Sequence, residues 1–215
     1  MTEVVVAFTD DPDWEAAALG PKFLAWAVAA GVVEAGAACH ARRLTPVEAP
    51  IGVQRPHNLH GLSTDSATAL FEVEGPRGGL DAPGLPQGIV ATTVCDRVVH
   101  AGSGEGRVGV TRIGLTRRQP GLTLEQFATG WRERHVPLVH RAGPRFTEYV
   151  TYVVRAGSVP WHGIAMQTFP DSGAAAAHDH NNRVVRPDVY EDAITLVASA
   201  EQYWASSPMP VEEDR

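Results

Sequence analysis

The sequence predicts an α+β protein in which two similar halves follow each other along the chain. Residues 107–155 read as strand, turn, capped helix and strand. A similar order of strands around a helix recurs, in weaker form, in residues 1–102. The stretch AGSGEG at Ala101–Gly106 has the composition of a flexible linker. We therefore expect one unit over residues 1–102 and a second over residues 107–215.

The first half is expected to be mostly strands. Its helix is predicted over Pro21–Ala30. Gly75–Gln87 is dense in glycine and proline, so a second helix is not expected there. The extended runs that predict its strands are Glu3–Phe8, Val33–Leu44, Ser66–Glu74 and Gly88–Val99.

The second half carries stronger signals for the same arrangement. Helices are predicted over Thr123–His140 and over a short alanine-rich run, Ser172–His180. The predicted strands are Val108–Thr116, Arg145–Arg155, His162–Phe169 and Ile194–Trp204.

The long helix of the second half has a well-defined start and one aromatic face. Thr123 is the expected N-cap, and Gln126 three residues later completes a capping box. Phe127, Trp131 and His135 follow at intervals of four, which places them along one face of an α-helix. That face is expected to meet the core or a pocket.

His135 is the polar member of this stripe. Pro137 should kink or end the helix near Val136, so His135 is expected close to a helix C-terminus, where the dipole favours its protonated form. His135 is then either a general acid/base or a half-buried histidine bonded to a neighbouring strand.

These residues resemble the EthD-like branch of the dimeric α+β barrel proteins. The similarity covers Val108–Trp204 and is most specific over Thr111–Tyr149. The resemblance implies ferredoxin-like βαββαβ modules, here in tandem with a degenerate N-terminal copy, whose two sheets form a barrel. It also implies cofactor-independent chemistry on small apolar metabolites. The motif consists of Leu115–Arg118, the Pro-Gly-Leu turn at 120–122, Thr123, Phe127, Trp131–His135 and Pro137–Val139.

Two tyrosines on the strand after the helix are candidates to hold a substrate oxygen. Tyr149 shares a strand face with Thr151 and Val153, whereas Tyr152 faces the opposite way. Tyr149 is our candidate partner for His135, and at most one of the two tyrosines should join it.

Further candidates for substrate contacts surround this unit. Trp131 and Phe127 would form an apolar wall, and Trp161 would edge a pocket before the third strand. The long loop Pro46–Thr64 contains His57 and His60 and is either a lid or a plain mobile loop.

Several classes of site are not expected. Residues two apart on a helix diverge, so His178 and His180 should not share a metal ion, and we interpret this segment as a solvated helix end. No nucleotide, flavin, zinc or nucleophile-elbow motif is present, so no metal or cofactor is expected. Cys39 and Cys95 occur in strand-like runs and should be buried free thiols.

Charge and hydropathy limit the partners. A net charge of −7 disfavours nucleic acid. No apolar stretch is long enough to cross a bilayer and no leader follows Met1, so a cytoplasmic protein without membrane contact is expected. A homodimer is also expected.

The sequence thus leads to a cofactor-independent lyase, cyclase or isomerase acting on a small, largely apolar carbonyl or aromatic metabolite. His135 would move the proton and Tyr149 would hold the oxyanion. The alternatives are a cofactor-free monooxygenase on a phenolic substrate, or a non-enzymatic module that binds a small molecule.

Overall fold

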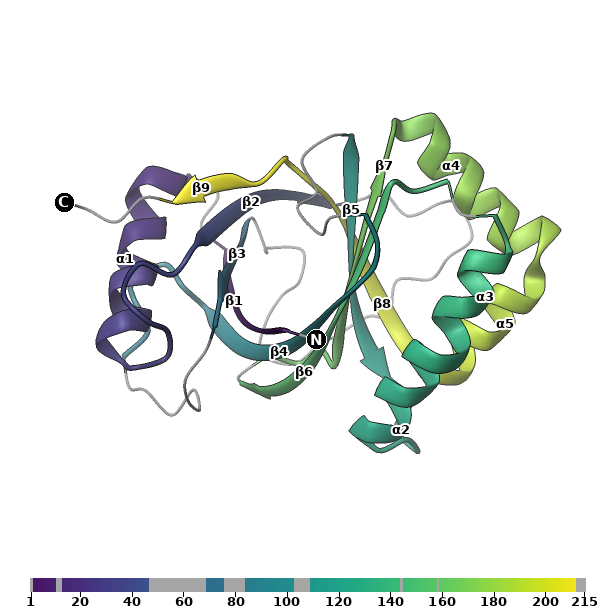
Figure 1. Cartoon of the computed structure of the whole chain (residues 1–215), viewed down its shortest axis with the longest axis horizontal. Helices are drawn as coiled ribbons and strands as arrows, with labels where there is room; N and C mark the ends of the chain where they lie inside the picture. The colour runs from purple at the N-terminus through teal and green to yellow at the C-terminus, as the bar shows by residue number, and fades with distance from the viewer. Residues whose placement is uncertain are drawn as a thin grey trace.

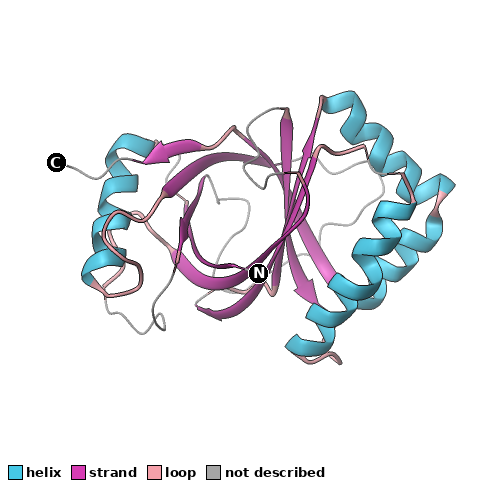
Figure 2. Cartoon of the chain, viewed as in Figure 1, coloured by secondary structure: helices cyan, strands magenta, loops and turns pink. Residues whose placement is uncertain are grey.

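The computed structural model of the 215-residue chain describes residues 2–10, 13–46, 69–75, 84–102, 109–143, 145–157 and 159–211. Strands and helices are both abundant, which confirms the expected mixture of α and β structure (Figure 2). Among the described residues, no helix combines the length and apolar character needed to cross a membrane.

The N-terminal half has one helix among its described residues. This helix begins at Ala16, so the expected start at Pro21 was wrong. A proline in the second turn removes only the hydrogen bond to the carbonyl of Ala17, and the helix continues through it. The elements of this half are β1 (Thr2–Thr9), α1 (Ala16–Ala29), β2 (Cys39–Pro46), β3 (Ala69–Glu74) and β4 (Ala91–Ala101).

The C-terminal half contains four strands, a longer helical layer and a short final strand. The expected elements are present and α5 and β9 are added to them, but the strand expected from Ile194 was wrong at its start, because Ile194–Leu196 belong to α5 and the strand begins at Val197. The elements are β5 (Val110–Arg118), α2 (Leu124–Thr129), the π-helix η2 (Gly130–His135), α3 (Val136–Arg141), β6 (Glu148–Gly157), β7 (Gly163–Phe169), α4 (Ser172–His180), the π-helix η3 (Asn181–Val185), α5 (Pro187–Leu196), β8 (Val197–Ala205) and β9 (Met209–Val211).

Eight of the strands close into one antiparallel barrel (Figure 1). The order around it is β3-β1-β4-β6-β7-β5-β8-β2, and pairing of β2 with β3 completes the circle, while β9 pairs with β2. Two seams join the halves, one between β4 and β6 and one between β2 and β8. Closure leaves none of these eight strands with an open edge, which disfavours aggregation through strand pairing.

Three apolar cores stabilise this arrangement. One fills the barrel and includes Phe8, Leu115 and Ile164. The second lies between α1 and the outer face of the N-terminal strands, and it contains Phe23. The third lies between the helices of the C-terminal half and their sheet. In Figure 1, α1 accordingly lies on one side of the barrel and α2–α5 lie on the other.

Both cysteines are buried and free, as expected. Cys39 belongs to the core under α1 and Cys95 to the core inside the barrel. Burial raises the pKa of each thiol to about 12, so both are neutral at physiological pH.

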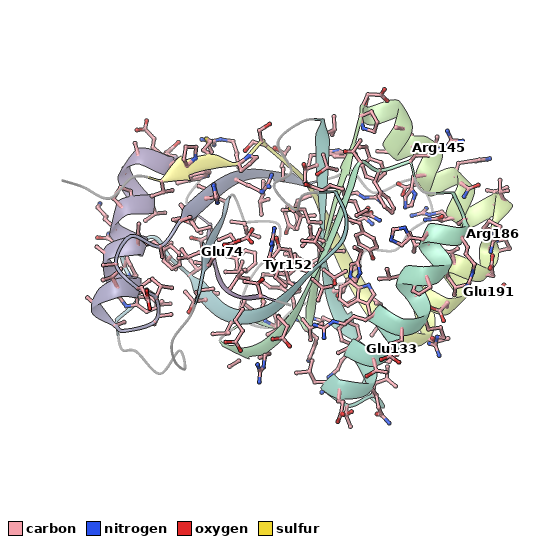
Figure 3. All side chains as sticks on the ribbon, in the orientation of Figure 1. Glu74, Glu133, Arg145, Tyr152, Arg186 and Glu191 are labelled. Carbon is pink, nitrogen blue, oxygen red and sulfur yellow. The ribbon has the colours of Figure 1, made fainter. Side chains whose placement is uncertain are left out.

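A polar contact crosses the barrel between the two halves. The Tyr152 hydroxyl, labelled in Figure 3, donates to Glu72 Oε2 at 3.0 Å, and Arg97 Nε lies 3.2 Å from Glu72 Oε1. The Glu72 side chain is only 12% exposed. Burial raises the pKa of its carboxyl, against the opposing effects of Arg97, of the Tyr152 hydrogen bond and of Arg42. Because a buried carboxyl is costly without partners, this cluster favours the observed pairing of the halves.

Tyr152→Phe removes this hydroxyl while keeping the ring, and should lower the free energy of unfolding by about 1–2 kcal/mol, because Glu72 loses a donor inside the barrel. Urea unfolding measures the loss. In a Glu72→Met background the same substitution should cost much less, since the hydroxyl no longer donates to a carboxylate. An equal loss in both backgrounds would contradict the role of Glu72.

Candidate active site

The two tyrosines of β6 point into different layers. Tyr149 belongs to the core beneath the helices, and Tyr152 belongs to the core inside the barrel. The expected alternation along this strand is confirmed, and the face that carries Tyr149, which the sequence left open, is the one covered by α2–α5. Tyr149 is therefore the tyrosine on the same side of the sheet as the aromatic helix.

Trp131 contacts Tyr149 directly. Its indole Nε1 donates to the Tyr149 hydroxyl at 3.3 Å, and its ring lies 5.1 Å from that of Phe127. Trp131 fits against β7 because Gly163 has no side chain, since a Cβ there would lie 2.0 Å from Trp131 Cζ3. Phe127, Trp131 and Tyr149 thus lie together in the core beneath the helices.

The capped start of the helix is confirmed, but its straight continuation is not. Thr123 Oγ1 accepts from Gln126 N at 3.1 Å, and Gln126 Oε1 accepts from Thr123 N at 2.8 Å. After Thr129 the helix changes to a π turn, in which the Val136 N–H bonds to the Trp131 carbonyl five residues back. Residues four apart no longer lie in line in such a turn.

His135 consequently leaves the line of Phe127 and Trp131. Its Nδ1 lies 3.1 Å from Asp192 Oδ2 on α5, and Arg134 pairs with the same carboxylate. Burial lowers the pKa of His135, although Asp192 acts in the opposite direction. The expectation that a helix end favours the charged form was wrong, because the helical path continues to Arg141 and burial dominates.

His100 is a site residue that the sequence did not suggest. His100 lies on the helix side of the sheet, the side that Asp96 also faces, next to a register shift of β4 with β6 between Val99 and Ala101. His100 Nε2 lies 2.8 Å from Thr151 Oγ1, and its ring lies 5.4 Å from that of Tyr149. The contact depends on the pairing of β4 with β6, which lie far apart in the sequence, so no local pattern could have indicated it.

The protonation states of this cluster follow from its burial. Burial, followed by the charges of His140 and Arg132, lowers the pKa of His100 to about 4. Burial raises the pKa of Tyr149 to about 12, although the Trp131 hydrogen bond opposes this. At neutral pH the cluster therefore offers a neutral imidazole and a protonated phenol. The ring of His140, on α3, lies 6.3 Å from that of Tyr149.

An open cavity of about 560 Å³ lies between the helix and the outer faces of β4 and β6, and His100, Tyr149 and Trp131 are not among the residues that line it. Its apolar floor includes Val153, which is two residues from Thr151 on the same strand face. Arg132, which acts on the pKa of His100, also lines the cavity and lies 3.8 Å from Asp96. The remaining lining residues are Leu124, Glu125, Ala128, Thr129, Glu133 and Arg155.

The other predicted site residues lie elsewhere. Tyr152 and Trp161 line the barrel core, where the Trp161 ring lies 4.9 Å from Phe8. His57 and His60 lie outside the described residues.

The histidines of α4 do not form a metal site. Among the described residues, no group of three His, Cys, Asp or Glu side chains is arranged to hold a metal ion. His178 is buried, and its Nε2 lies 2.9 Å from Asn182 Nδ2, while Asp179 pairs with Arg112 at 2.6 Å. The expected solvated helix end was therefore wrong for His178, which packs against Phe169.

Comparison with solved structures identifies the fold. The chain matches a protein described as anthrone oxidase-like with a TM-score of 0.55 and 12% identity, over 99% of this chain and 94% of that one. It also matches a protein of Fusobacterium nucleatum, provisionally described as a monooxygenase, with a TM-score of 0.50 and 9% identity, over 98% of this chain and 94% of that one. No protein-family model and no curated protein matches the chain.

These neighbours share the fold of this chain, a closed antiparallel barrel of the dimeric α+β barrel type. The expected barrel is thus confirmed. At such low identity the likeness extends to the fold alone.

Acidification from pH 7 to about pH 5 should lower the free energy of unfolding. Burial depresses the pKa of His100 and His178 to about 4 and also lowers those of His135 and His162, so the unfolded chain binds more protons below pH 6.5. The raised pKa of Glu72 favours the folded chain on acidification, but this is one group against four histidines that favour the unfolded chain. Urea unfolding at the two pH values measures the change.

His100→Asn serves as the control for this pH dependence. It removes one buried titrating group and should make the difference between pH 7 and pH 5 smaller. The pKa shifts would be contradicted if the wild-type chain had the same free energy of unfolding at pH 7 and pH 5. They would also be contradicted if His100→Asn left the difference between the two pH values unchanged.

Proposed function

We propose that the chain is a cofactor-independent enzyme that moves a proton on a small, largely apolar carbonyl or aromatic metabolite. The substrate would bind in the cavity between the helix α2–η2 and the outer face of β6. The proposal rests on the cluster of His100, Tyr149 and Trp131, and on Arg132, which lines that cavity and acts on the pKa of His100.

Tyr149 is assigned to the oxygen of the substrate. A phenol whose pKa lies near 12 stays protonated, so its O–H can donate to a carbonyl or phenol oxygen as negative charge develops there. The indole N–H of Trp131 donates to the same hydroxyl, which fixes its position and strengthens its acidity. Phe127 and Trp131, which pack together in the core beneath the helices, would form the apolar wall of the substrate site.

His100 is assigned to the proton. It is neutral at physiological pH and contacts Tyr149, so it can accept a proton from a carbon next to the polarised oxygen. Its bond to Thr151 holds the ring in place. We prefer His100 to His135 for this role because His135 contacts Asp192 instead.

A cofactor-free monooxygenase is the second candidate, favoured by the names of the two structural neighbours. It requires the same first step. The carbanion left by proton removal would give electrons to O₂, and the resulting hydroperoxide would lose water to leave a new carbonyl group. A lyase, cyclase or isomerase would instead rearrange the same carbanion without oxygen.

We also propose that the two halves, residues 1–102 and 107–215, are ferredoxin-like modules and that the second is EthD-like. The order β4-β1-β3-β2 in the first half equals β8-β5-β7-β6 in the second, which supports a duplicated unit. The Phe-Trp-His spacing at 127, 131 and 135 supports the EthD-like assignment.

Anthrone is a suitable probe, because its central carbon carries acidic hydrogens next to an aromatic carbonyl system. Under nitrogen in deuterated buffer the protein should accelerate hydrogen exchange at that carbon, measured by mass spectrometry. His100→Asn and Tyr149→Phe should each slow the exchange by about 10²–10⁴-fold. In air, formation of anthraquinone measures the oxygenase outcome separately.

His135→Asn is the matched control, because His135 belongs to the same helical layer but contacts Asp192 of α5. The His135→Asn variant should retain hydrogen-exchange activity within a few-fold of the wild type. If only the His135 variant lost hydrogen exchange, His135 rather than His100 would be the residue that accepts the proton. Tight binding of anthrone without any exchange would instead favour a binding module.

A further inference from the structure

The cavity and the cluster of the candidate active site are separated along the sheet. Asp96 of β4 and Val153 of β6 are strand partners, and both line the cavity. His100 follows Asp96 by four residues on β4, which corresponds to about 13 Å along a strand. Tyr149 precedes Val153 by the same interval on the antiparallel strand β6, so it lies in the same direction from the cavity. A substrate in the cavity therefore reaches neither His100 nor Tyr149 unless a group between them moves.

Trp131 forms one part of the partition between the cavity and the cluster. Its indole N–H donates to the Tyr149 hydroxyl, and its ring reaches Gly163, the strand partner of Val153. The side chain thus covers the sheet from the cluster to the level of the cavity floor. Trp131 is only 4% exposed and packs in the core beneath the helices, so it is held in place.

Arg132, the next residue of η2, forms the other part. Its Nη2 lies 3.8 Å from Asp96 Oδ2, and its side chain lines the cavity. Its positive charge also lowers the pKa of His100, so the guanidinium lies within electrostatic range of the cluster as well. Arg132 is therefore the lining residue that lies between the cavity and His100.

Arg132 is held less firmly than Trp131. The contact with Asp96 balances its charge, but 3.8 Å is too long for a hydrogen bond. Nε and Nη2 of Arg132 are buried and have no hydrogen-bond partner among the described residues. Asp96 is also shared, because Arg155 Nη1 lies 3.5 Å from its other oxygen, Oδ1. Buried donors without acceptors are costly, so the free energy that opposes a movement of this side chain is small.

We propose that Arg132 is a gate between the cavity and the His100–Tyr149 cluster. In the position described above, its side chain closes the cavity toward the cluster. Rotation away from Asp96 opens the passage, while Trp131 keeps the Tyr149 hydroxyl in place. This inference rests on the proposed function, because the cavity gains its catalytic groups only when the gate is open. Admission of the substrate is then a step separate from proton transfer.

Chemical modification of His100 tests the gate without any substrate. Diethyl pyrocarbonate reacts with neutral imidazole, and His100 is neutral at pH 7 because its pKa is lowered to about 4. Arg132→Ala should accelerate modification of His100 about tenfold, because reactivity follows the fraction of molecules in which a group is accessible. Mass spectrometry of the peptide that contains His100 measures the rate. His178, a buried histidine beneath the same helices, is the internal control and should keep its rate.

Two further variants test the direction of the effect. Asp96→Asn removes the charge that attracts Arg132, so it should also accelerate modification of His100. Arg155→Gln leaves Asp96 to Arg132 alone, so it should slow the modification or leave it unchanged. An unchanged rate at His100 in Arg132→Ala would overturn the gate. Equal acceleration at His178 would do so as well, because it would mean that the whole helical layer had loosened.

Hydrogen exchange of anthrone separates the gate from the proposed function. If both are correct, Arg132→Ala should raise kcat/KM for exchange by at least about threefold, since entry precedes the chemical step. Faster modification of His100 without exchange in either protein would support the gate and refute the proposed function. Exchange by the wild type together with unchanged modification in Arg132→Ala would refute the gate and support the function.

Discussion

The structure depends on closure of one barrel by strands from two halves of a single chain. Of the two seams, β4–β6 and β2–β8, the first matters more for the candidate site, because both faces of β4 carry side chains that contact the other half. Its inner face carries Arg97, which pairs with Glu72 inside the barrel, and its outer face carries Asp96 and His100. A strand of the N-terminal half thus supplies the imidazole that contacts Tyr149 of the C-terminal half. The first half therefore contributes to the candidate site as well as to the packing.

The same seam explains why the sequence does not reveal which face of β6, that of Tyr149 or that of Tyr152, meets the helices. From Glu148 to Val154, every residue of β6 is buried, so hydrophobicity does not distinguish the two faces. Alternation alone correctly predicts that Tyr149 and Tyr152 point in opposite directions. Which face meets the helices is decided by the neighbouring strands, and their pairing is non-local.

Local signals predicted the elements better than they predicted the site. The capping box at Thr123 and the strand-like runs depend on neighbouring residues, and both are present in the structure. The position of His135 depends instead on a π turn. Gly130 lies at the start of this turn, where a Cβ would come within 2.6 Å of Leu196 on α5, and Pro137 has no N–H to continue the ordinary hydrogen bonds. The i, i+4 spacing of Phe127, Trp131 and His135 therefore does not place His135 in line with the other two, because the π turn between them changes its direction.

Burial also selects the chemistry available to His100 and Tyr149. Because the same packing that excludes water lowers the pKa of His100 and raises that of Tyr149, neither group is charged at neutral pH. The two arginines that line the cavity are already matched, since Asp96 lies within 3.8 Å of Arg132 and 3.5 Å of Arg155. A neutral substrate with one polar oxygen suits such a site better than an anion does, because an anion would have to compete with Asp96 for the two arginines. Negative charge that develops on this oxygen during proton removal would then be met by the Tyr149 hydroxyl rather than by a permanent cation.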